Sequence, residues 1–366
     1  MRIIVDARPL ALPMQGGVGR VAEELVRALA AAHPEDELIC ATTGSAISVL
    51  PPKLLELPNV KHVHLKIPNK LWSAACILNR VSFFEQIEQR CGKTDAFLMP
   101  NLGFVGCLPK NAPSVLLLHD LSFLIEPRWF TFKQRLWHKA VKAHDLIRKA
   151  TRLLAVSETT KRDAISLLNL SEEKISVIPL GSTLAEKSLD PSYQLPVTSY
   201  PDHFVLALGL DDPRKNSATA IEAVKILRQK NGYEDVALVV VGAPLGGVRA
   251  GTKPAPAWLR IIPHPTDTEL AALYQNAAAF LYPSWYEGYG LPLHEAARHG
   301  TPCVASTAGA LPETAPLGTL FANPAKPQHW IEATKLALNQ ERRIILSQNT
   351  WNQAALALHQ ALTSAS

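Results

Sequence analysis

The sequence predicts an α/β protein with two doubly wound halves, each a parallel sheet with helices on both faces. Three observations lead to this prediction. The chain has 366 residues, which suits two domains better than one. Short apolar runs alternate with segments of helical periodicity, which is typical of strands joined by crossover helices. The alternation occurs twice, on either side of a stretch that contains several prolines and no clear periodicity.

The domain boundaries follow from this proline-containing stretch. We expect an N-terminal domain over residues 1–182, a linker over residues 183–202 and a C-terminal domain over residues 203–340. The remaining residues, 341–366, have helical periodicity. We expect them to form a C-terminal helix that packs back toward the N-terminal domain.

The composition excludes several classes of protein. Lys and Arg number 37 against 32 Asp and Glu, and the net charge of +5 fits an anionic small ligand or an anionic membrane surface. No cationic tract is interleaved with stacking aromatic residues, so we expect no nucleic-acid partner. No apolar run reaches the roughly 18 residues of a membrane-spanning helix. Five scattered cysteines without a C-x-x-C pair predict reduced thiols in a cytoplasmic protein.

The first half begins with a strand-like apolar run and continues with alternating elements. The expected strands are residues 2–6, 38–42, 60–66, 96–99, 114–118, 152–156 and 174–178. The expected helices are residues 21–32, 46–55, 71–90 and 129–149, and a further helix that opens at Ser157. Ligands of such sheets bind beyond the carboxyl ends of the strands, so the candidate site residues lie in the loops that follow strands.

The loop after the first strand is rich in glycine. Gly17, Gly19 and Ala22 formally match a dinucleotide-binding pattern. In that pattern the glycines follow the strand directly, whereas about ten residues intervene here, so we discount the match. We interpret Gly16 and Gly17 as a loop that gives a substrate close access to the backbone. A flexible connection with a glycine at the helix entry is the alternative.

Three histidines follow or occupy strands of this half. His119 stands directly after the expected strand 114–118, at an end where ligands bind, so we favour a functional role over a structural one. His62 and His64 have the spacing of metal ligands, but the pattern lacks a third ligand. We therefore expect these two histidines on a solvated face.

Residues 128–149 carry seven cations and one acid, Asp145. An apolar stripe accompanies them; it consists of Phe132, Leu136, Ala140, Ala143 and Ile147. One interpretation is an amphipathic helix that packs on the core and has a basic outer face. The other is an interfacial helix that lies on an anionic membrane surface.

The second half repeats the alternation. The expected strands are residues 204–207, 236–241, 259–262, 277–282 and 301–305, and the expected helices between them are residues 217–230, 267–276 and 291–298. Arg214 and Lys215 are adjacent at the entry of the first of these helices. A guanidinium binds phosphate oxygens bidentately and an ammonium acts as a point charge, so the pair suits a diphosphate.

The most informative stretch is residues 283–296, PSWYEGYGLPLHEA. Gly288 and Gly290 form a loop between a strand and a helix, an arrangement that directs backbone N–H groups and a positive helix end toward a phosphate. Two carboxylates, Glu287 and Glu295, have seven residues between them. The first lies in the loop and the second about one turn into the helix.

With these residues the chain resembles the retaining GT-B glycosyltransferases of family 4. The marks of that family occur in order over nearly the whole chain: Gly16–Gly17, His119–Asp120, Val156–Glu158, Ile178–Gly181, Gly209 with Arg214–Asn216, and the E-x7-E element from Glu287 to Glu295. The resemblance implies a GT-B fold, in which two Rossmann-like domains face a central cleft.

The resemblance also implies roles for single residues of the second half. Arg214 and Lys215 would hold the donor diphosphate and offset charge on the departing nucleotide. Glu287 would contact the transferred sugar, as a positioning residue and not a nucleophile, and Glu295 would accept the ribose hydroxyls. The backbone amides of Gly288, Tyr289, Gly290 and Leu291 would bind the same phosphates or sugar hydroxyls.

In the first half, the resemblance implies that His119 touches the sugar and phosphate from the side of the N-terminal domain. Gly16 and Gly17 would close on the donor phosphates and shape the acceptor pocket. The segment that follows Glu313 is shorter than in the family pattern, so we leave Glu313 outside the candidate site.

The implied reaction needs no metal and no cofactor. The sequence has no Asp-x-Asp loop in a strand context, and fixed cations would instead stabilise the leaving diphosphate. The opening residues resemble bacterial mannosyltransferases, which favours GDP-mannose as donor and a glycan or lipid-linked oligosaccharide as acceptor. Such a protein would be cytoplasmic, or peripheral on the inner face of the plasma membrane. The alternatives are a hydrolysing epimerase and a non-catalytic subunit that binds a nucleotide sugar.

Overall fold

The computed structural model describes the chain except residues 12–15, 182–200, 202, 243–255, 347–348 and 365–366. The chain divides into two compact units, one formed by Met1–Gly181 with Asn349–Ser366 and the other by Ser182–Gln348. The expected linker, residues 183–202, lies outside the described residues apart from Pro201.

The first unit is built around a sheet of parallel strands. They are β1 (Arg2–Asp6), β2 (Glu37–Thr43), β3 (Val60–Leu65), β4 (Ala96–Met99), β5 (Ser114–Leu118), β6 (Arg152–Ala155) and β7 (Ile175–Val177). Their order in the sheet is β3-β2-β1-β4-β5-β6-β7, so the direction of winding reverses between β1 and β4. Such a reversal opens a crevice beyond the carboxyl ends of the two strands.

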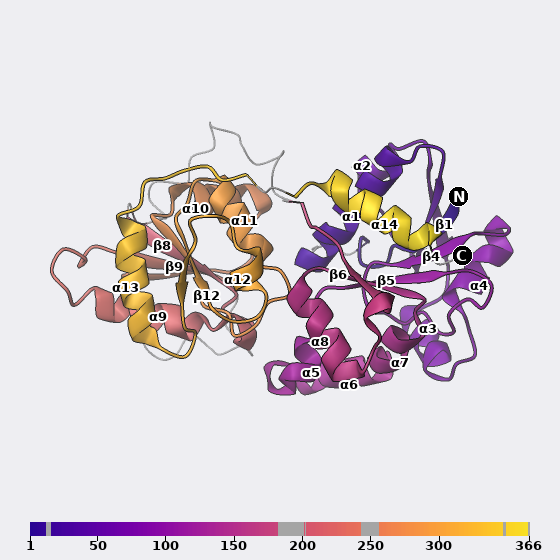
Figure 1. The fold of residues 1–366 in the computed structure, drawn as a ribbon, viewed down its shortest axis with the longest axis horizontal. Coiled ribbons are helices and arrows are strands. Elements are labelled where there is room, and N and C mark those ends of the chain that lie inside the picture. Colours follow the sequence, from indigo (N-terminus) through magenta and orange to yellow (C-terminus); the bar gives the residue numbers. More distant parts are fainter. Residues whose placement is uncertain (12–15, 182–200, 202, 243–255, 347–348, 365–366) are drawn as a thin grey trace. The chain divides into compact units, whose positions relative to one another are not determined.

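Helices cover both faces of this sheet. They are α1 (Gly17–Ala32), α2 (Pro52–Leu55), α3 (Asn69–Ile77), α4 (Phe83–Cys91), α5 (Ser122–Ile125), α6 (Phe132–Ala140), α7 (Ala143–Lys149), α8 (Glu158–Leu168) and α14 (Trp351–Thr363), with short 3₁₀ helices at Pro127–Trp129 and Glu172–Lys174. Side chains of α3, α4, α7 and α8 share one core with the sheet. Helix α14 lies beside α1 and also contacts β4, β5 and β6, as Figure 1 shows.

Two long helices expected in the first unit are each divided in two. The expected helix 71–90 forms α3 and α4, and Asn79 between them has a φ of +54°. The expected helix 129–149 forms α6 and α7, and Lys142 between them has a φ of +56°. A residue in this left-handed region cannot continue an α-helix, so each break reorients the following turn.

Two other helices are shorter than expected. The helix expected over residues 46–55 is reduced to α2, because Pro52 occupies its first turn and the residue before a proline avoids the helical region. The C-terminal helix, expected over residues 341–366, begins only at Trp351. Thr350 and Gln353 form a capping box there, which fixes the start of α14.

The second unit has a sheet of the same winding. Its strands are β8 (Phe204–Leu208), β9 (Ala237–Val241), β10 (Leu259–Ile262), β11 (Ala279–Tyr282), β12 (Cys303–Ser306) and β13 (Leu320–Ala322). The order is β10-β9-β8-β11-β12-β13, with the reversal between β8 and β11. Its helices are α9 (Ser217–Leu227), α10 (Asp267–Asn276), α11 (Leu291–Arg298), α12 (Leu311–Thr314) and α13 (Pro327–Leu338), with a 3₁₀ helix at Pro213–Lys215.

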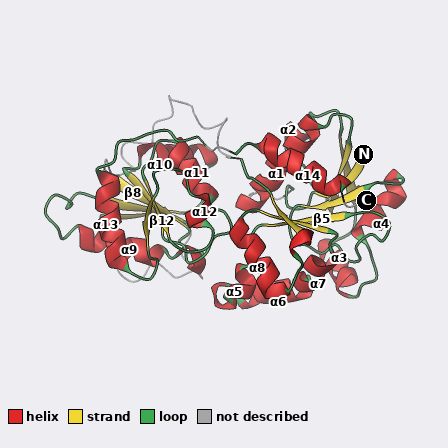
Figure 2. Cartoon of the chain, in the orientation of Figure 1, coloured by secondary structure: helices red, strands yellow, loops and turns green. Residues whose placement is uncertain are grey.

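Alternate residues of one strand serve two different cores in this unit. In β8, Val205 and Ala207 belong to the core under α9 and α13, whereas Phe204 and Leu206 belong to the core under α10, α11 and α12. Because successive strand side chains point to opposite faces, a strand covered on both sides is apolar throughout. Figure 2 shows the sheet of each unit between its helices.

Candidate functional site

The loops that follow β8 and β11 meet at the reversal point of the second sheet. The loop after β8 contains the 3₁₀ helix Pro213–Lys215, and the loop after β11 begins at Pro283. The Trp285 amide donates to the Arg214 carbonyl oxygen at 2.8 Å, and the Asn216 side-chain amide donates to the Pro283 carbonyl oxygen at 3.0 Å. These bonds hold the two loops in a fixed register at the carboxyl end of the sheet.

A buried carboxylate joins two cations at this point. Glu287 is 6% exposed, and one of its oxygens accepts from Lys215 Nζ at 2.7 Å while the other accepts from Arg214 Nη1 at 3.3 Å. Lys215 Nζ also donates to the Tyr282 hydroxyl at 2.5 Å, and Arg214 Nη2 donates to Asp212 at 3.2 Å. We call Arg214, Lys215 and Glu287 the cation cluster. It brings together three residues that the sequence singled out.

The positive charges of Arg214 and Lys215 keep the Glu287 carboxylate ionised. Burial alone would raise the pKa of Glu287, but the charges of Lys215 and Arg214 outweigh burial and lower this pKa to about 2. Burial raises the pKa of Tyr282 well above its usual value, and the Glu287 charge adds to that effect. At neutral pH the cluster therefore holds an ionised carboxylate, and the Tyr282 phenol keeps its proton.

Two glycines make room for the cation cluster. Gly209 has a φ of +83°, and a Cβ there would meet the Lys215 side chain at 2.3 Å. Gly309 has a φ of +60°, and a Cβ there would meet the Glu287 backbone at 2.7 Å. The Ala310 amide also donates to the Glu287 carbonyl oxygen at 2.9 Å. Side chains at either glycine would displace a member of the cluster.

Sequence reasoning missed Asp212 and Tyr282 as partners of the cluster. Asp212 offered a signal, because an acid two residues before an arginine in a turn can bind both its amide and its guanidinium; the Arg214 amide donates to Asp212 at 2.9 Å. Tyr282 gave no such signal, because it is the last residue of an apolar strand; its hydroxyl accepts from Lys215 Nζ.

The glycine loop leads from Glu287 into α11. Gly290 has a φ of +96° and precedes Leu291, the first residue of the helix. The Thr314 hydroxyl donates to the Tyr289 carbonyl oxygen, and the Tyr289 ring stacks on His294 at a centroid distance of 5.1 Å. Burial lowers the pKa of His294 to about 4, so this ring is neutral at pH 7. The loop is thus held from two sides.

Glu295 is buried in α11, with 5% of its surface exposed. The Tyr274 hydroxyl donates to its carboxylate at 3.1 Å.

The remaining predicted residues belong to the first unit. His119 follows β5, is half-buried and donates from Nε2 to the Pro100 carbonyl oxygen at 2.8 Å. Burial lowers its pKa, so the ring is neutral and Nδ1 is an acceptor. Gly16 caps α1 and Gly17 is its first residue; no atom of the described residues lies within 4 Å of a Cβ built on either.

The reversal point of the first unit holds a pair that the sequence did not reveal. Asp6 ends β1 and is 2% exposed, and both its oxygens accept from Arg8, at 2.7 Å and 2.6 Å. Arg8 also donates to the Phe104 carbonyl oxygen at 2.9 Å, and its guanidinium lies 4.6 Å from the centre of the Phe83 ring. The signal for this pair was an acid at a strand end followed two residues later by an arginine.

The histidines of β3 are not on a solvated face, so that expectation was wrong. His62 and His64 are half-buried, and both bond to the Thr42 hydroxyl at 2.9 Å. A shared hydroxyl on the neighbouring strand explains their alternate spacing.

Helix α6 exposes apolar side chains beside cations. Phe132 is 74% exposed, Leu136 54% and Trp137 38%, and α6 has no buried residue. Ala143 and Ile147 of α7 are buried, so the break at Lys142 divides the expected stripe into an exposed and a buried part. Among the described residues, no helix has both the length and the apolar character needed to span a bilayer.

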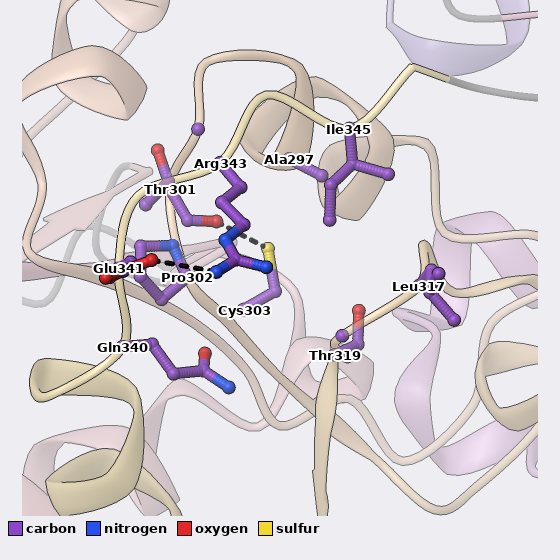
Figure 3. A pocket seen from close by; sticks show the side chains of 12 residues that line it. Ala297, Thr301, Pro302, Cys303, Leu317, Thr319, Gln340, Glu341, Arg343 and Ile345 are labelled. Carbon is purple, nitrogen blue, oxygen red and sulfur yellow. Dashed lines mark hydrogen bonds and ion pairs between the residues drawn. The ribbon is translucent and has the colours of Figure 1, made fainter.

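A cavity of about 380 Å³ lies elsewhere in the second unit (Figure 3). Thr301, Pro302 and Thr319 line it, at the amino ends of β12 and β13, and Arg343 and Ile345 close it. It lies at the amino ends of the strands, whereas the loops that carry the cation cluster follow the carboxyl ends. The cavity is therefore separate from the candidate site.

Two family models match the chain. The one described as Glycosyltransferase Family 4 matches residues 15–186, and the one described as Glycosyl transferases group 1 matches residues 202–340. O-antigen chain mannosyltransferase B of Escherichia coli is 26% identical over 344 residues, which are 88% of this chain and 87% of that protein. MMP alpha-(1->4)-mannosyltransferase of Mycolicibacterium hassiacum is 34% identical over 187 residues, 49% of this chain and 43% of that protein.

Solved structures share the fold over the whole chain. Sucrose-phosphate synthase from Thermosynechococcus elongatus has a TM-score of 0.72 at 18% identity, with all of both chains covered. Anabaena HepE, solved with UDP and glucose, has a TM-score of 0.62 at 16% identity and covers 100% of this chain and 97% of its own. At these low sequence identities, the similarity shows a shared fold and nothing more.

Proposed function

Because the chain belongs to the group 1, family 4 glycosyltransferases and has the expected GT-B fold, we propose that it transfers a hexose from a nucleotide-diphosphate sugar to a glycan or lipid-linked acceptor. GDP-mannose is the first candidate donor, since the relatives named above are mannosyltransferases. The O-antigen relative supports an acceptor that belongs to a bacterial surface polysaccharide.

The cation cluster at the reversal point of the second sheet carries this proposal. A nucleotide diphosphate beyond the ends of β8 and β11 would meet Arg214, Lys215 and the start of α11. When the bond between the anomeric carbon and the diphosphate breaks, negative charge develops on the leaving oxygen. Fixed cations and helix-end amides in a partly buried site stabilise such charge without reorganising. The proposed reaction therefore needs no metal ion.

Glu287 acts as a positioning residue in this scheme. Both its oxygens are engaged by the cations, and its low pKa keeps it ionised, so it is suited to orienting Lys215 and Arg214 and to accepting a sugar hydroxyl. We propose that the acceptor oxygen bonds to the anomeric carbon on the face that the diphosphate leaves. The acceptor proton then passes to the leaving diphosphate, and the configuration is retained.

The first unit would contribute His119 and the glycine loop. The bond from His119 Nε2 to Pro100 fixes the ring and leaves Nδ1 to accept a hydroxyl of the sugar. The open space at Gly16 and Gly17 among the described residues would let donor phosphates or acceptor approach the backbone. Glu295 would accept the ribose hydroxyls together with Tyr274.

Nucleotide release from a panel of donors, with and without acceptor extract, tests the proposal. A transferase releases nucleotide only when acceptor is present, and GDP-mannose should give the fastest release. Activity that survives EDTA supports the metal-free scheme, and the anomeric configuration of the product reports retention. Release without acceptor would indicate the hydrolysing epimerase, and donor binding without release the non-catalytic subunit.

We also propose that α6 binds the anionic inner face of the plasma membrane. Phe132, Leu136 and Trp137 are exposed next to Lys133, Arg135 and Lys139, which is the composition of an interfacial helix. This location would bring the enzyme to a lipid-linked acceptor.

Co-sedimentation with vesicles tests the location. The chain should sediment more with anionic than with neutral vesicles, and reversal of the three α6 cations to glutamate should abolish the difference. A matched variant with Lys53, Lys61 and Lys66 reversed, on another part of the first unit, is the control. Equal recovery with both vesicle types would remove the membrane proposal.

A further inference from the structure

Two residues near the end of α1 and one residue of α14 converge in the first unit. His33 caps the C-terminus of α1, Asp36 follows in the next turn, and His359 lies on α14. One ligand atom of each residue lies within 4.8 Å of the others. We call these three residues the His–Asp–His cluster.

The contacts within this cluster leave one nitrogen without a bond. His359 Nε2 lies 2.9 Å from Asp36 Oδ2, and the rings of His33 and His359 stack at 3.7 Å with an interplanar angle of 7°. Asp36 is only 3% exposed, and its second oxygen accepts from the Met1 amino group. His33 Nε2 is buried and finds no hydrogen-bond partner among the described residues. An unbonded buried imidazole nitrogen is costly unless a cation or proton donor reaches it.

We propose that the His–Asp–His cluster binds a divalent transition-metal ion, with Zn²⁺ as the best fit. Two imidazole nitrogens and one carboxylate oxygen are a ligand set that Zn²⁺ accepts, with water as the fourth ligand. A Zn²⁺ ion at its usual bond lengths holds ligand atoms roughly 3.4 Å apart. To bind one ion, the ligand atoms must come closer together, and the stacked rings of His33 and His359 must turn out of their parallel arrangement so that a nitrogen lone pair of each points at the ion.

The surroundings of the cluster have the features of a metal site. His33 Nδ1 lies 3.2 Å from Glu35 Oε1, so a carboxylate already orients the ring that offers Nε2. The Asn59 amide donates to the carbonyl oxygens of Ala30, His33 and Asp36 at 3.0, 3.1 and 3.0 Å, which fixes the turn that carries two of the ligands. The C-terminal end of α1 also presents negative partial charge, which favours a cation.

A metal ion here would join α14 to α1. Helix α14 comes from the end of the chain and packs on α1 without any described covalent link. One coordinated ion would fix its position through His359. The function proposed above does not depend on this site.

The test uses the full chain, stripped with EDTA and titrated with Zn²⁺ in equilibrium dialysis. We expect one Zn²⁺ per wild-type chain, loss of that ion in His33→Ala and His359→Ala, and an affinity roughly 10–100-fold weaker in Glu35→Gln. The control is His203→Ala, which removes a surface histidine 3.4 Å from Asp235 in the second unit and should bind as the wild type does. Binding that persists in both cluster variants, or a wild type that takes up no ion, overturns the proposal.

A second measurement uses the wild type alone, so it tests the proposal even if the substituted variants fail to fold. In the wild type, Zn²⁺ should raise the protection of amides 351–363 against hydrogen exchange, and EDTA should reverse the effect. The visible spectrum with Co²⁺ should show the bands of a tetrahedral site with nitrogen and oxygen ligands. Unchanged exchange in α14 at saturating Zn²⁺ would contradict the proposal independently of any substitution.

Discussion

The two units wind their sheets in the same way but place different charges at the reversal points. In the first unit, the Arg8 guanidinium donates to Asp6 and to the Phe104 carbonyl oxygen, and it lies over the Phe83 ring. In the second unit, two cations share the single carboxylate of Glu287. The first arrangement closes one cation on one buried acid, whereas the second joins two cations to the buried Glu287 and, through Arg214, to the partly exposed Asp212.

This difference shows what topology does and does not determine. The winding order brings the loops after two particular strands together in both units. The residues placed in those loops decide whether the meeting point is a closed structural pair or a larger cluster such as the proposed diphosphate site. Five substitutions or titrations test the comparison, and the largest expected effect comes first.

Arg214→Ala should lower transfer by roughly 10²–10³-fold, because it removes a fixed donor from the leaving diphosphate. It should also weaken donor binding, since in the proposed site the guanidinium contacts the phosphates both before and during the reaction. Initial rates and donor titration of the same preparation measure both effects. Wild-type turnover in this variant would remove the cation cluster from the reaction.

Asp6→Asn should lower the free energy of unfolding by about 3 kcal/mol, because it leaves the Arg8 charge without its buried partner. Donor affinity of the folded protein should not change. Urea unfolding and donor titration measure the two quantities, and Glu24→Gln, which affects an ion pair on the outside of α1, is the control. A loss of donor affinity with intact stability would show that the first reversal point also binds substrate.

Acid should weaken the second unit through Glu287. Its pKa is about 2 when folded against 4.5 ordinarily, so its contribution is complete above pH 4.5 and is lost as the pH falls toward 2. The 2.5-unit difference corresponds to roughly 3 kcal/mol. Urea unfolding from pH 6 to pH 2.5 should show this loss in the wild type and a flatter profile in Glu287→Gln. Parallel profiles would mean that the carboxylate is not held by the cations.

Glu287→Gln should retain donor binding and lower transfer by about 10²-fold, because Lys215 and Arg214 lose the charge that positions them. Measuring donor affinity and single-turnover rate separates the two outcomes. Unchanged turnover would exclude Glu287 as a positioning residue.

Asp212→Asn should have the smallest effect, a decrease of about two- to fivefold in donor affinity. Asp212 is partly exposed and bonds Arg214 from the rim of the cluster, where ion pairs contribute little. A change as large as that of Arg214→Ala would place Asp212 in direct contact with the reacting groups.

Sequence periodicity predicted two parallel sheets with helices on both faces, because buried parallel strands are short apolar runs that stand out between amphipathic helices. The adjacent cations and the glycine loop singled out Arg214, Lys215 and Glu287 as candidate site residues, and the reversal point explains why they meet. The helix breaks at Asn79 and Lys142 were not predicted: Asn adopts the left-handed conformation more often than most residues, whereas Lys gives no such signal. The Asp6–Arg8 pair was missed because it resembles an ordinary turn at a strand end.

The return of α14 to the first unit has a consequence for synthesis on the ribosome. The surface of α1 that α14 covers stays open until residues 182–348 have been made. At 5–20 residues per second this interval lasts roughly 10–30 s. Throughout it the earlier unit has an uncovered apolar face on α1, and the later unit completes α13, its last described helix, before α14 is made, so the half translated second is the half that can fold first.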